Sequence, residues 1–357
     1  MFVETADAIY ETAFHHAQIE ITGCCNMHCA HCRASMEKPI FMPLEQIEKV
    51  LRFTERNMGE EFNLTLSGGE PLLHPELVEI VGMGVRYGCQ EIVITTNGSL
   101  LTEELLQRLN EVSAGNVTIQ VSLDSTDPQT HDGFRGFAGA YERAVRGLEA
   151  IRGYERLQSS IRMTIQKETY QQMEDMVRLA IGVGCVRIGV GNIIPAGLGA
   201  EEHFVLTPAE KKAFLTQLAA LHRKYQGQID ITTEDPLKAI IEDSPWIDED
   251  ILENEEVDGL FGGCTAGIDC FNVDTEYNLT PCSVFRTPIL NLREHEGPET
   301  MEQAYAASEV VQRMFSRTFS GKCNSCRHKR ICGGCRATAS FFGAGDHFCS
   351  DGTCWME

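Results

Sequence analysis

From about residue 17 onward, short apolar segments alternate with longer segments in which apolar positions recur at helical spacing. Six of the short segments predict strands, and they span residues 17–21, 62–66, 92–95, 117–123, 161–165 and 186–190. Residues 43–58, 102–112 and 207–225 predict helices, and Thr102 has the side chain of a helix cap. Six such units predict an α/β fold built on a parallel barrel or an open parallel sheet.

Composition changes twice beyond these units. Residues 242–258 hold nine acidic and no basic side chains, which is typical of a solvated linker. Beyond Gly262 the sequence is rich in Cys and Gly and poor in long periodic segments, as expected where metal ligation replaces an extensive apolar core. We therefore expect an N-terminal segment at 1–15, a core domain at 16–225, an acidic linker at 226–262 and a small Cys-rich domain at 263–357.

The charge of the chain disfavours some classes of partner. Its 357 residues include 30 Lys plus Arg and 52 Asp plus Glu, and the formal net charge of −22 repels phosphate backbones and anionic lipid. No apolar run approaches the roughly 18 residues that a membrane span needs, and the first residues lack the pattern of a signal peptide. We expect a soluble cytoplasmic protein that has neither nucleic acid nor a membrane as its partner.

The cysteines point to metal. There are 15 of them, and a disulfide framework is not expected in the cytosol, where thiols are kept reduced. Four lie at positions 24–32 and nine lie between Cys264 and Cys354. The sequence therefore predicts two separate metal-binding regions.

The first region, Cys25-Asn-Met-His-Cys29-Ala-His-Cys32, directly follows the first predicted strand. Three thiolates are too few for a closed tetrahedral zinc site. A [4Fe-4S] cluster held by three cysteines, by contrast, keeps one iron open to a cofactor or a substrate. The alternative is a zinc loop completed by His28 or His31.

In this triplet the chain resembles the radical S-adenosylmethionine (SAM) family, whose hallmark is C-x3-C-x2-C after the first strand of a partial (β/α)6, TIM-like barrel. The resemblance extends over most of the chain. It implies that SAM chelates the open iron of a cluster held by Cys25, Cys29 and Cys32. It also implies that one electron from this cluster reductively cleaves SAM to a 5′-deoxyadenosyl radical, which abstracts a hydrogen atom from the substrate.

Residues at the ends of the later strands match the family's SAM-binding loops. Ser67-Gly68-Gly69-Glu70-Pro71 matches its GGEP motif, in which glycines permit close backbone approach and a carboxylate accepts hydrogen bonds from an ammonium group. For Arg135 the alternative to pairing with the SAM carboxylate is a structural salt bridge. The resemblance implies that SAM contacts come from Ser67, Gly68, Gly69, Glu70, Asn97, Ser122, Asp124, Arg135 and Asn192.

The second region contains Cys323-x2-Cys326-x5-Cys332-x2-Cys335, with further cysteines on both sides. It resembles the SPASM extension of radical SAM enzymes, which binds two auxiliary [4Fe-4S] clusters and makes three clusters in all. The resemblance implies one cluster on Cys264, Cys270, Cys282 and Cys335, and another on Cys323, Cys326, Cys332 and Cys354. Structural zinc is the alternative. The thiols left over, which suit packed or surface positions, are Cys24, Cys89, Cys185 and Cys349.

Two positions depart from the usual SPASM pattern. Cys332 and Cys335 are separated by two residues instead of three, and Tyr277 stands where a glycine is typical. The shorter spacing also occurs in haem-pathway enzymes of the family. The end of this chain, Asp351-Gly-Thr-Cys354-Trp, resembles the end of those enzymes, and for this reason Cys354 is preferred to Cys349 as the last ligand.

The substrate is less sharply indicated. Segments such as Cys32-Arg-Ala and residues 130–136 resemble both haem-pathway enzymes and peptide maturases. Ser283 stands where sulfatase-maturing relatives have an aspartate, which disfavours that reaction. We expect a ribosomally made peptide that is crosslinked or epimerised. The alternatives are modification of a haem or haem d1 precursor, modification of a carbohydrate or nucleoside, and a non-enzymatic, zinc-stabilised binding module.

The resemblance also implies protein partners. Reductive cleavage needs a low-potential electron donor such as a flavodoxin or a ferredoxin. A peptide substrate could be presented by a separate peptide-recognition protein, because only about 15 residues precede the first predicted strand.

Overall fold

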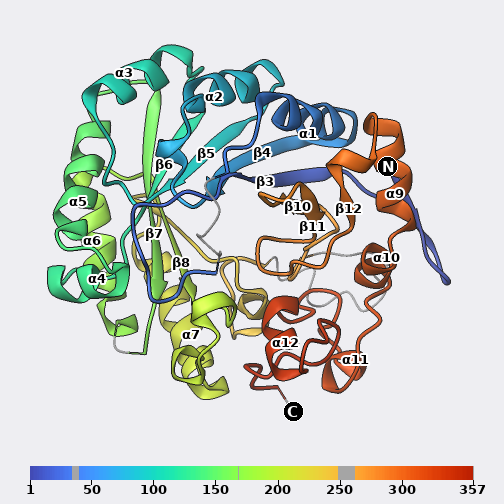
Figure 1. Cartoon of the computed structure of the whole chain (residues 1–357). Coiled ribbons are helices and arrows are strands. Elements are labelled where there is room, and N and C mark those ends of the chain that lie inside the picture. The colour runs from blue at the N-terminus through green and yellow to red at the C-terminus, as the bar shows by residue number, and fades with distance from the viewer. Residues whose placement is uncertain (34–39, 168, 248–261, 357) are drawn as a thin grey trace.

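The first part of the chain alternates strands and helices in a regular order (Figure 1). The structure is a computed structural model that describes residues 1–33, 40–167, 169–247 and 262–356. A hairpin of β1 (Phe2–Glu4) and β2 (Ile9–Glu11) precedes the repeating units. The units comprise β3 (Phe14–Thr22), α1 (Leu44–Asn57), β4 (Met58–Gly68), α2 (Leu77–Arg86), β5 (Glu91–Thr96), α3 (Glu103–Val112), β6 (Val117–Ser122), α4 (Pro128–Arg135), α5 (Ala140–Ile151), β7 (Leu157–Ile165), α6 (Met173–Val183), β8 (Arg187–Asn192), α7 (Pro208–Lys224) and β9 (Asp230–Thr232).

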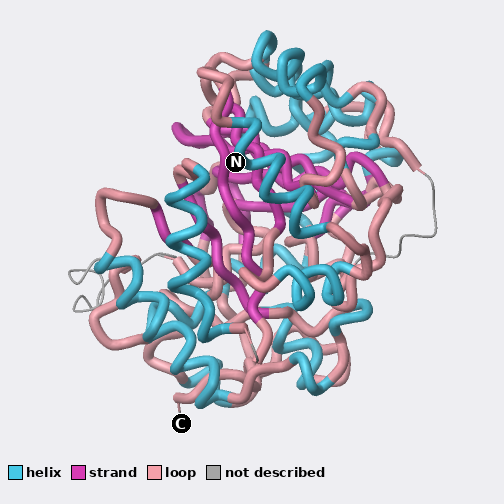
Figure 2. The backbone as a smooth tube through the Cα atoms, turned by 90° about the vertical axis from the view of Figure 1, so that its left-hand side faces the viewer, coloured by secondary structure: helices cyan, strands magenta, loops and turns pink. Residues whose placement is uncertain are grey.

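The strands β3 to β9 pair in chain order, and every neighbouring pair is parallel. Helices α1 to α6 follow the outer side of these strands in Figure 1. In the view turned by 90°, strands run through the middle of the molecule and helices lie around them (Figure 2). The carboxyl ends of the parallel strands therefore share one edge, where loops from distant parts of the sequence meet.

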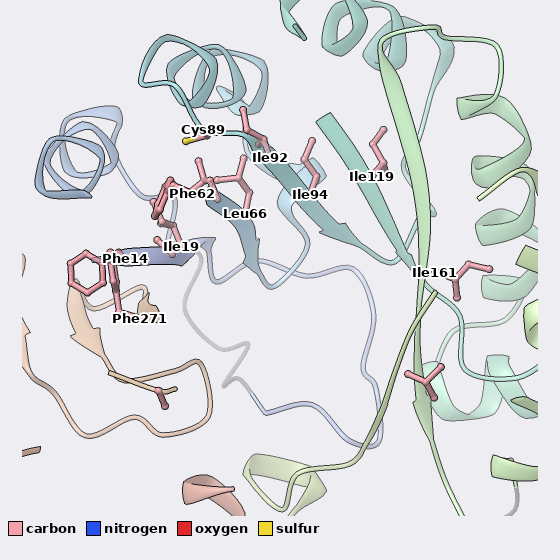
Figure 3. Close-up of a cluster of buried hydrophobic side chains, with 14 of the residues drawn as sticks. Phe14, Ile19, Phe62, Leu66, Cys89, Ile92, Ile94, Ile119, Ile161 and Phe271 are labelled. Carbon is pink, nitrogen blue, oxygen red and sulfur yellow. The ribbon is translucent and has the colours of Figure 1, made fainter. Parts of the chain in front are cut away.

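The two faces of the sheet differ in polarity because side chains alternate along each strand. On β4, Phe62, Leu64 and Leu66 are fully buried, and they belong to the large apolar cluster beneath the helices (Figure 3). The residues between them are polar, and Ser67 accepts a hydrogen bond from the Gln18 amide (2.6 Å). The polar residues of neighbouring strands thus form a common inner surface that leads to the carboxyl ends.

The Cys-rich part of the chain extends the same sheet. It contains β10 (Cys270–Val273), β11 (Asn278–Thr280), β12 (Leu290–Asn291), α9 (Pro298–Ala307), α10 (Glu309–Ser316), α11 (Lys322–Ser325) and α12 (Arg336–Phe342). The strand β10 pairs in parallel with β3, while β11 and β12 follow as antiparallel neighbours. One ten-stranded sheet therefore runs from the Cys-rich part to β9.

The predicted strands and helices are all present, with ends that differ by a few residues. The Thr102 hydroxyl caps α3 by accepting from the Leu105 amide, and Thr207 with Glu210 forms a capping box on α7. The additional strand β9 lies in the segment expected to be a linker. Residues 248–261 of that segment lie outside the described residues, so the domain bounds stay a prediction. None of the helices in the described ranges has both the length and the apolar character that a membrane span requires.

Candidate active site and metal centres

The loop that follows β3 carries the three cysteines of the first motif and is fastened to two distant segments. The Ala30 amide donates to the Phe134 carbonyl (2.9 Å), and the Leu198 amide donates to the Cys32 carbonyl (2.9 Å). The ring of His31 stacks on that of Phe134, with centroids 4.3 Å apart. The loop is therefore held at the edge of the sheet where the parallel strands end.

The three thiols of this loop, Cys25, Cys29 and Cys32, are half-buried. Burial raises the pKa of Cys25 to about 11. Burial also raises the pKa of Cys29, although the neighbouring Arg135 guanidinium acts in the opposite direction. Metal binding to Cys25 and Cys29 therefore has to release thiol protons. Three thiols on one short loop fit the donor set of a three-cysteine iron-sulfur cluster.

The two glycines of the GGEP motif lie directly against the cysteine loop. Gly68 has φ +127°, and a Cβ atom there would collide with the Thr22 carbonyl oxygen, while a Cβ atom on Gly69 would collide with the Cys24 carbonyl oxygen. The Gly69 amide donates to Thr22 (2.8 Å), and the Glu70 amide donates to Cys24 (2.7 Å). Only glycines permit this approach, so the motif fixes the cysteine loop to the end of β4.

The Glu70 side chain is buried and already has three internal donors. Its carboxylate accepts from the Thr96 hydroxyl (2.6 Å), the Asn97 amide (2.8 Å) and the Leu72 amide (3.1 Å). Burial raises its pKa, and these hydrogen bonds act against that rise. The carboxylate thus joins the GGEP turn to the end of β5. Its binding of the SAM ammonium group stays a prediction, and such binding would share oxygens that these donors occupy.

Arg135 lies between the end of β6 and the cysteine loop. Its Nε donates to the Asp124 carboxylate (2.7 Å), and its Nη1 approaches the Cys29 sulfur (3.8 Å). Burial is the largest single effect on Asp124 and would raise its pKa, but the Arg135 guanidinium, together with His31, His131 and the Thr164 amide, holds that pKa below its usual value. The structure thus gives Arg135 the salt-bridge role that was the alternative in the sequence analysis. Contact between Arg135 and a SAM carboxylate stays a prediction.

Among the remaining predicted SAM contacts, Asn97 lies beside the cysteine loop. Its amide nitrogen donates to the Asn26 side chain (2.8 Å), next to Cys25. Ser67 is bonded to Gln18, as described above, and the buried Ser122 ends β6 beside Arg162 of β7. All of these residues lie at or near the carboxyl ends of β4 to β7.

Asn192 has a partner that sequence reasoning missed. Its side-chain oxygen accepts from the Lys211 ammonium group (2.7 Å), which also pairs with Asp235. Lys211 is buried on α7, on the same face as Phe214 and Leu218. The sequence did contain a signal for this partner. The spacing of Lys211 from Phe214 and Leu218 places a lysine on the apolar face of the helix, where a charged side chain needs a partner.

Four cysteines of the second region line one pocket near the end of the chain. They are the ones that the SPASM resemblance assigned together, namely Cys323, Cys326, Cys332 and Cys354. Leu237 and Ile240 also line this pocket, so it has an apolar side. The Cys349 thiol instead donates to the Ala339 carbonyl (2.9 Å). Four thiols around one pocket fit the donor set of a [4Fe-4S] cluster.

The other proposed set gathers around Cys264. Burial, followed by the charge of a neighbouring Cys264 thiolate, raises the pKa of Cys282 to about 11 and that of Cys335 to about 12. Burial also raises the pKa of Cys270, and the charges of Asp269, Cys282 and Cys264 add to this effect. The Cys264 amide donates to the Cys332 carbonyl (2.9 Å), so the two cysteine sets adjoin.

The zinc alternative requires several ligands around one ion. Within the described part of the chain, no group of three or more His, Cys, Asp or Glu side chains is arranged to hold a single metal ion. The fit to iron-sulfur clusters rests on the number and grouping of the cysteine side chains described above. Assignment of individual cysteines to clusters stays a prediction.

Comparison with known proteins adds a family to this geometry. Residues 19–180 match the model of the Radical SAM superfamily. The AdoMet-dependent heme synthase of Methanosarcina barkeri is 29% identical to this chain over 333 residues, which are 92% of each protein. Mycofactocin maturase MftC of Mycobacterium ulcerans is 25% identical and covers 91% of this chain and 83% of its own length.

Solved structures share the fold. The crystal structure of SuiB from Streptococcus suis superposes with a TM-score of 0.76 at 17% identity, and it covers 97% of this chain and 78% of that one. A structure of anSMEcpe with bound AdoMet has a TM-score of 0.65, also at 17% identity, and covers 91% of this chain and 89% of that one. These likenesses confirm the predicted partial barrel with a Cys-rich part after it.

Proposed function

We propose that this chain, an enzyme of the radical SAM superfamily, cleaves SAM at the loop after β3 and uses the product radical to remove a hydrogen atom from a substrate. The observation that carries the proposal is the attachment of the GGEP turn to the loop that carries Cys25, Cys29 and Cys32. The Glu70 amide makes this attachment by donating a hydrogen bond to the Cys24 carbonyl, directly before Cys25. This attachment brings a three-cysteine donor set beside polar strand ends. A [4Fe-4S] cluster on Cys25, Cys29 and Cys32 would supply the electron for the cleavage.

The surrounding residues would position the cluster and SAM without gaining or losing protons themselves. Gly68 and Gly69 would hold the turn against the cysteine loop, because a side chain at either position would collide with the Thr22 or Cys24 carbonyl oxygen. Arg135 would hold its positive charge beside Cys29 and keep Asp124 ionised. Asn97, Ser122 and Asn192 would offer polar groups from three further strand ends to the ribose, adenine or carboxylate of SAM.

To test for cleavage of SAM, the enzyme is prepared anaerobically, reduced with dithionite and incubated with SAM. The 5′-deoxyadenosine that forms is then measured. We expect the Cys29→Ala variant to lose at least about a hundredfold in this product, because its cluster lacks a ligand. Cys24→Ala is the matched control, since the neighbouring side chain is not in the proposed donor set. Normal cleavage by Cys29→Ala would show that the site is misplaced.

For the substrate we propose a peptide that is crosslinked or epimerised. The relatives named mycofactocin maturase and subtilosin biosynthesis protein AlbA support this class, at 25% and 24% identity over 91% and 90% of this chain. The second candidate is a tetrapyrrole. Three relatives named AdoMet-dependent heme synthase favour it, at 25% to 29% identity over at least 92% of this chain.

Substrate-dependent deuterium transfer separates the two classes. The enzyme is incubated with SAM and either a propionate-bearing tetrapyrrole or a peptide encoded beside its gene, each deuterated on carbon. A peptide substrate predicts deuterium in 5′-deoxyadenosine only in the peptide reaction. Transfer from the tetrapyrrole alone would replace the peptide proposal by the second candidate.

We further propose that residues 263–357 form a SPASM domain that follows a core at 16–225 and a linker at 226–262. Two auxiliary clusters there would exchange an electron with the substrate radical, and a flavodoxin or ferredoxin would reduce the enzyme. The cysteine pocket around Cys323 and Cys354 supports this arrangement. Anaerobic iron and sulfide analysis tests it, with about twelve irons per chain expected for three cubanes. Zinc in their place would contradict it.

A further inference from the structure

Arg317 is a buried arginine with incomplete hydrogen bonding. It follows α10 in the left-handed region, with φ +50°, and only 1% of its surface is exposed. Its Nη2 donates to the Gly262 carbonyl (3.1 Å). Within the residues that the structure describes, its Nε and Nη1 have no hydrogen-bond partner.

Such a side chain is costly in a metal-free interior. A guanidinium group does not give up its proton in proteins, so it carries its charge into the interior. A buried charge with unused donors loses its hydration without a replacement. Its backbone conformation is also unfavourable for a residue with a Cβ atom. A group that accepts hydrogen bonds and carries negative charge would complete this site.

The surroundings of Arg317 identify that group. The side chains near enough for their charge to act on its guanidinium include Cys264 and Cys332, together with Asp269 and the like-charged Arg336. Nη1 lies so close to Gly333 that a Cβ atom at this glycine would collide with it. Cys264 belongs to one proposed cluster set and Cys332 to the other, and a backbone hydrogen bond of 2.9 Å joins these two residues. The guanidinium therefore lies where the two sets adjoin.

A second buried arginine shows the contrast. Arg336 is fully buried, and its Nη1 donates to the carbonyls of His347 (3.2 Å) and Cys349 (2.7 Å), while Nε donates to Gly334 (3.3 Å). Its Nη2 reaches the Cys323 sulfur (3.9 Å), so all three of its nitrogens have partners within the protein. The unused Arg317 donors are a particular property of that residue, not of buried arginines in this part of the chain.

We propose that Arg317 is a positioning residue that donates its free N–H groups to sulfur atoms of the auxiliary iron-sulfur clusters at the junction of the two cysteine sets. The proposal rests on the proposed SPASM function. A cation with hydrogen-bond donors stabilises the more negative, reduced state of a cluster, so Arg317 raises the reduction potential. Its place between the sets allows it to act on both clusters.

The experiment compares the wild-type holoenzyme with Arg317→Gln, Arg317→Lys and the control Arg313→Gln. Arg313 lies one turn earlier on α10, and its guanidinium stacks on the Phe348 ring (3.7 Å). Iron and sulfide are measured first, and the auxiliary clusters are then titrated with reductant under electron paramagnetic resonance. The radical SAM cluster, titrated in the same samples, serves as an internal reference.

We expect Arg317→Gln to keep its iron and to lower the reduced-to-oxidised ratio of an auxiliary cluster about tenfold at a fixed potential, which is about 59 mV. Arg317→Lys keeps the charge and should show a smaller change, and Arg313→Gln should match the wild type. Loss of auxiliary iron from Arg317→Gln, with the radical SAM cluster intact, would also support the proposal if Arg317→Lys keeps that iron, because the positive charge would then be what holds the clusters.

Wild-type reduction potentials in Arg317→Gln would overturn the proposal. Loss of all iron, or of soluble protein, in both Arg317 variants would also overturn it, because such a loss indicates a purely structural role. Failure of the proposed SPASM function is a separate result, because it appears in the wild type as an iron content of about four or less per chain.

Discussion

Glu20 and Arg286 form a bidentate ion pair across 266 positions of the chain. The Arg286 nitrogens Nη1 and Nη2 donate to the two Glu20 oxygens at 3.2 and 3.0 Å, and the side chain of Glu20 is 2% exposed. Arg33 donates to the same carboxylate at 3.0 Å. Because Arg33 follows Cys32 and Arg286 lies four residues after Cys282, this one acid connects the loop of the first motif with a loop of the Cys-rich part.

Replacement of Glu20 by glutamine should loosen this connection. Arg33 and Arg286 would lose the carboxylate that they share, and their partial exposure to water moderates this loss. We therefore expect the free energy of unfolding to fall by about 2 kcal/mol. Urea denaturation of the anaerobic protein measures it. The matched control is Glu48→Gln, whose partner Arg52 lies on the exposed side of α1. Equal effects of the two substitutions would refute a special role for Glu20.

Addition of one methyl group at Gly69 should disable the site. The new Cβ atom would collide with the backbone carbonyl group of Cys24. A backbone group cannot rotate aside as the end of a flexible side chain can, so the cysteine loop must shift. We expect SAM cleavage to fall about a hundredfold, as for an ångström-scale misplacement of reacting groups. Gly182→Ala is the control, because a Cβ atom there meets nothing within 4 Å. Unchanged cleavage in Gly69→Ala would contradict the close contact.

The pocket near the C-terminus distinguishes two neighbouring cysteines. Cys354 lines it together with Cys323, Cys326 and Cys332, whereas the Cys349 thiol is bonded to the Ala339 carbonyl. We expect Cys354→Ala to contain about four irons fewer than the wild type, and Cys349→Ala to keep the wild-type content. Iron analysis of the two purified variants decides between them, and the reverse pattern would exchange their assignments.

Tyr277 is a test of side-chain packing against backbone strain. Its φ of +70° favours glycine, but its ring is buried and Arg293 stacks on it at 3.8 Å. Tyr277→Gly relieves about 1 kcal/mol of strain and forfeits about 3 kcal/mol of packing. We therefore expect a net loss of about 2 kcal/mol on urea unfolding. Tyr277→Phe keeps the ring and should change little, and a stabilised glycine variant would show that strain dominates.

Several elements were predictable because their signals are local. The alternation around Phe62, Leu64 and Leu66 is that of a strand with one apolar face, and the cap at Thr102 marks the start of α3. The three-residue strand β9 is too short to show such a pattern. The parallel pairing of β10 with β3 joins segments that are about 250 residues apart, and nothing in either segment alone specifies it.

The sequence by itself determined six of the strands, three of the helices and the spacing of the cysteines, since periodicity and motif spacing act over a few residues. It also indicated the radical SAM family. Only the tertiary structure decided the partners of the buried charges: Glu20 with Arg33 and Arg286, and Arg135 with Asp124. The physical reason is that a charged side chain carries no local sign of burial, and its partner is chosen by the folding of distant segments against one another.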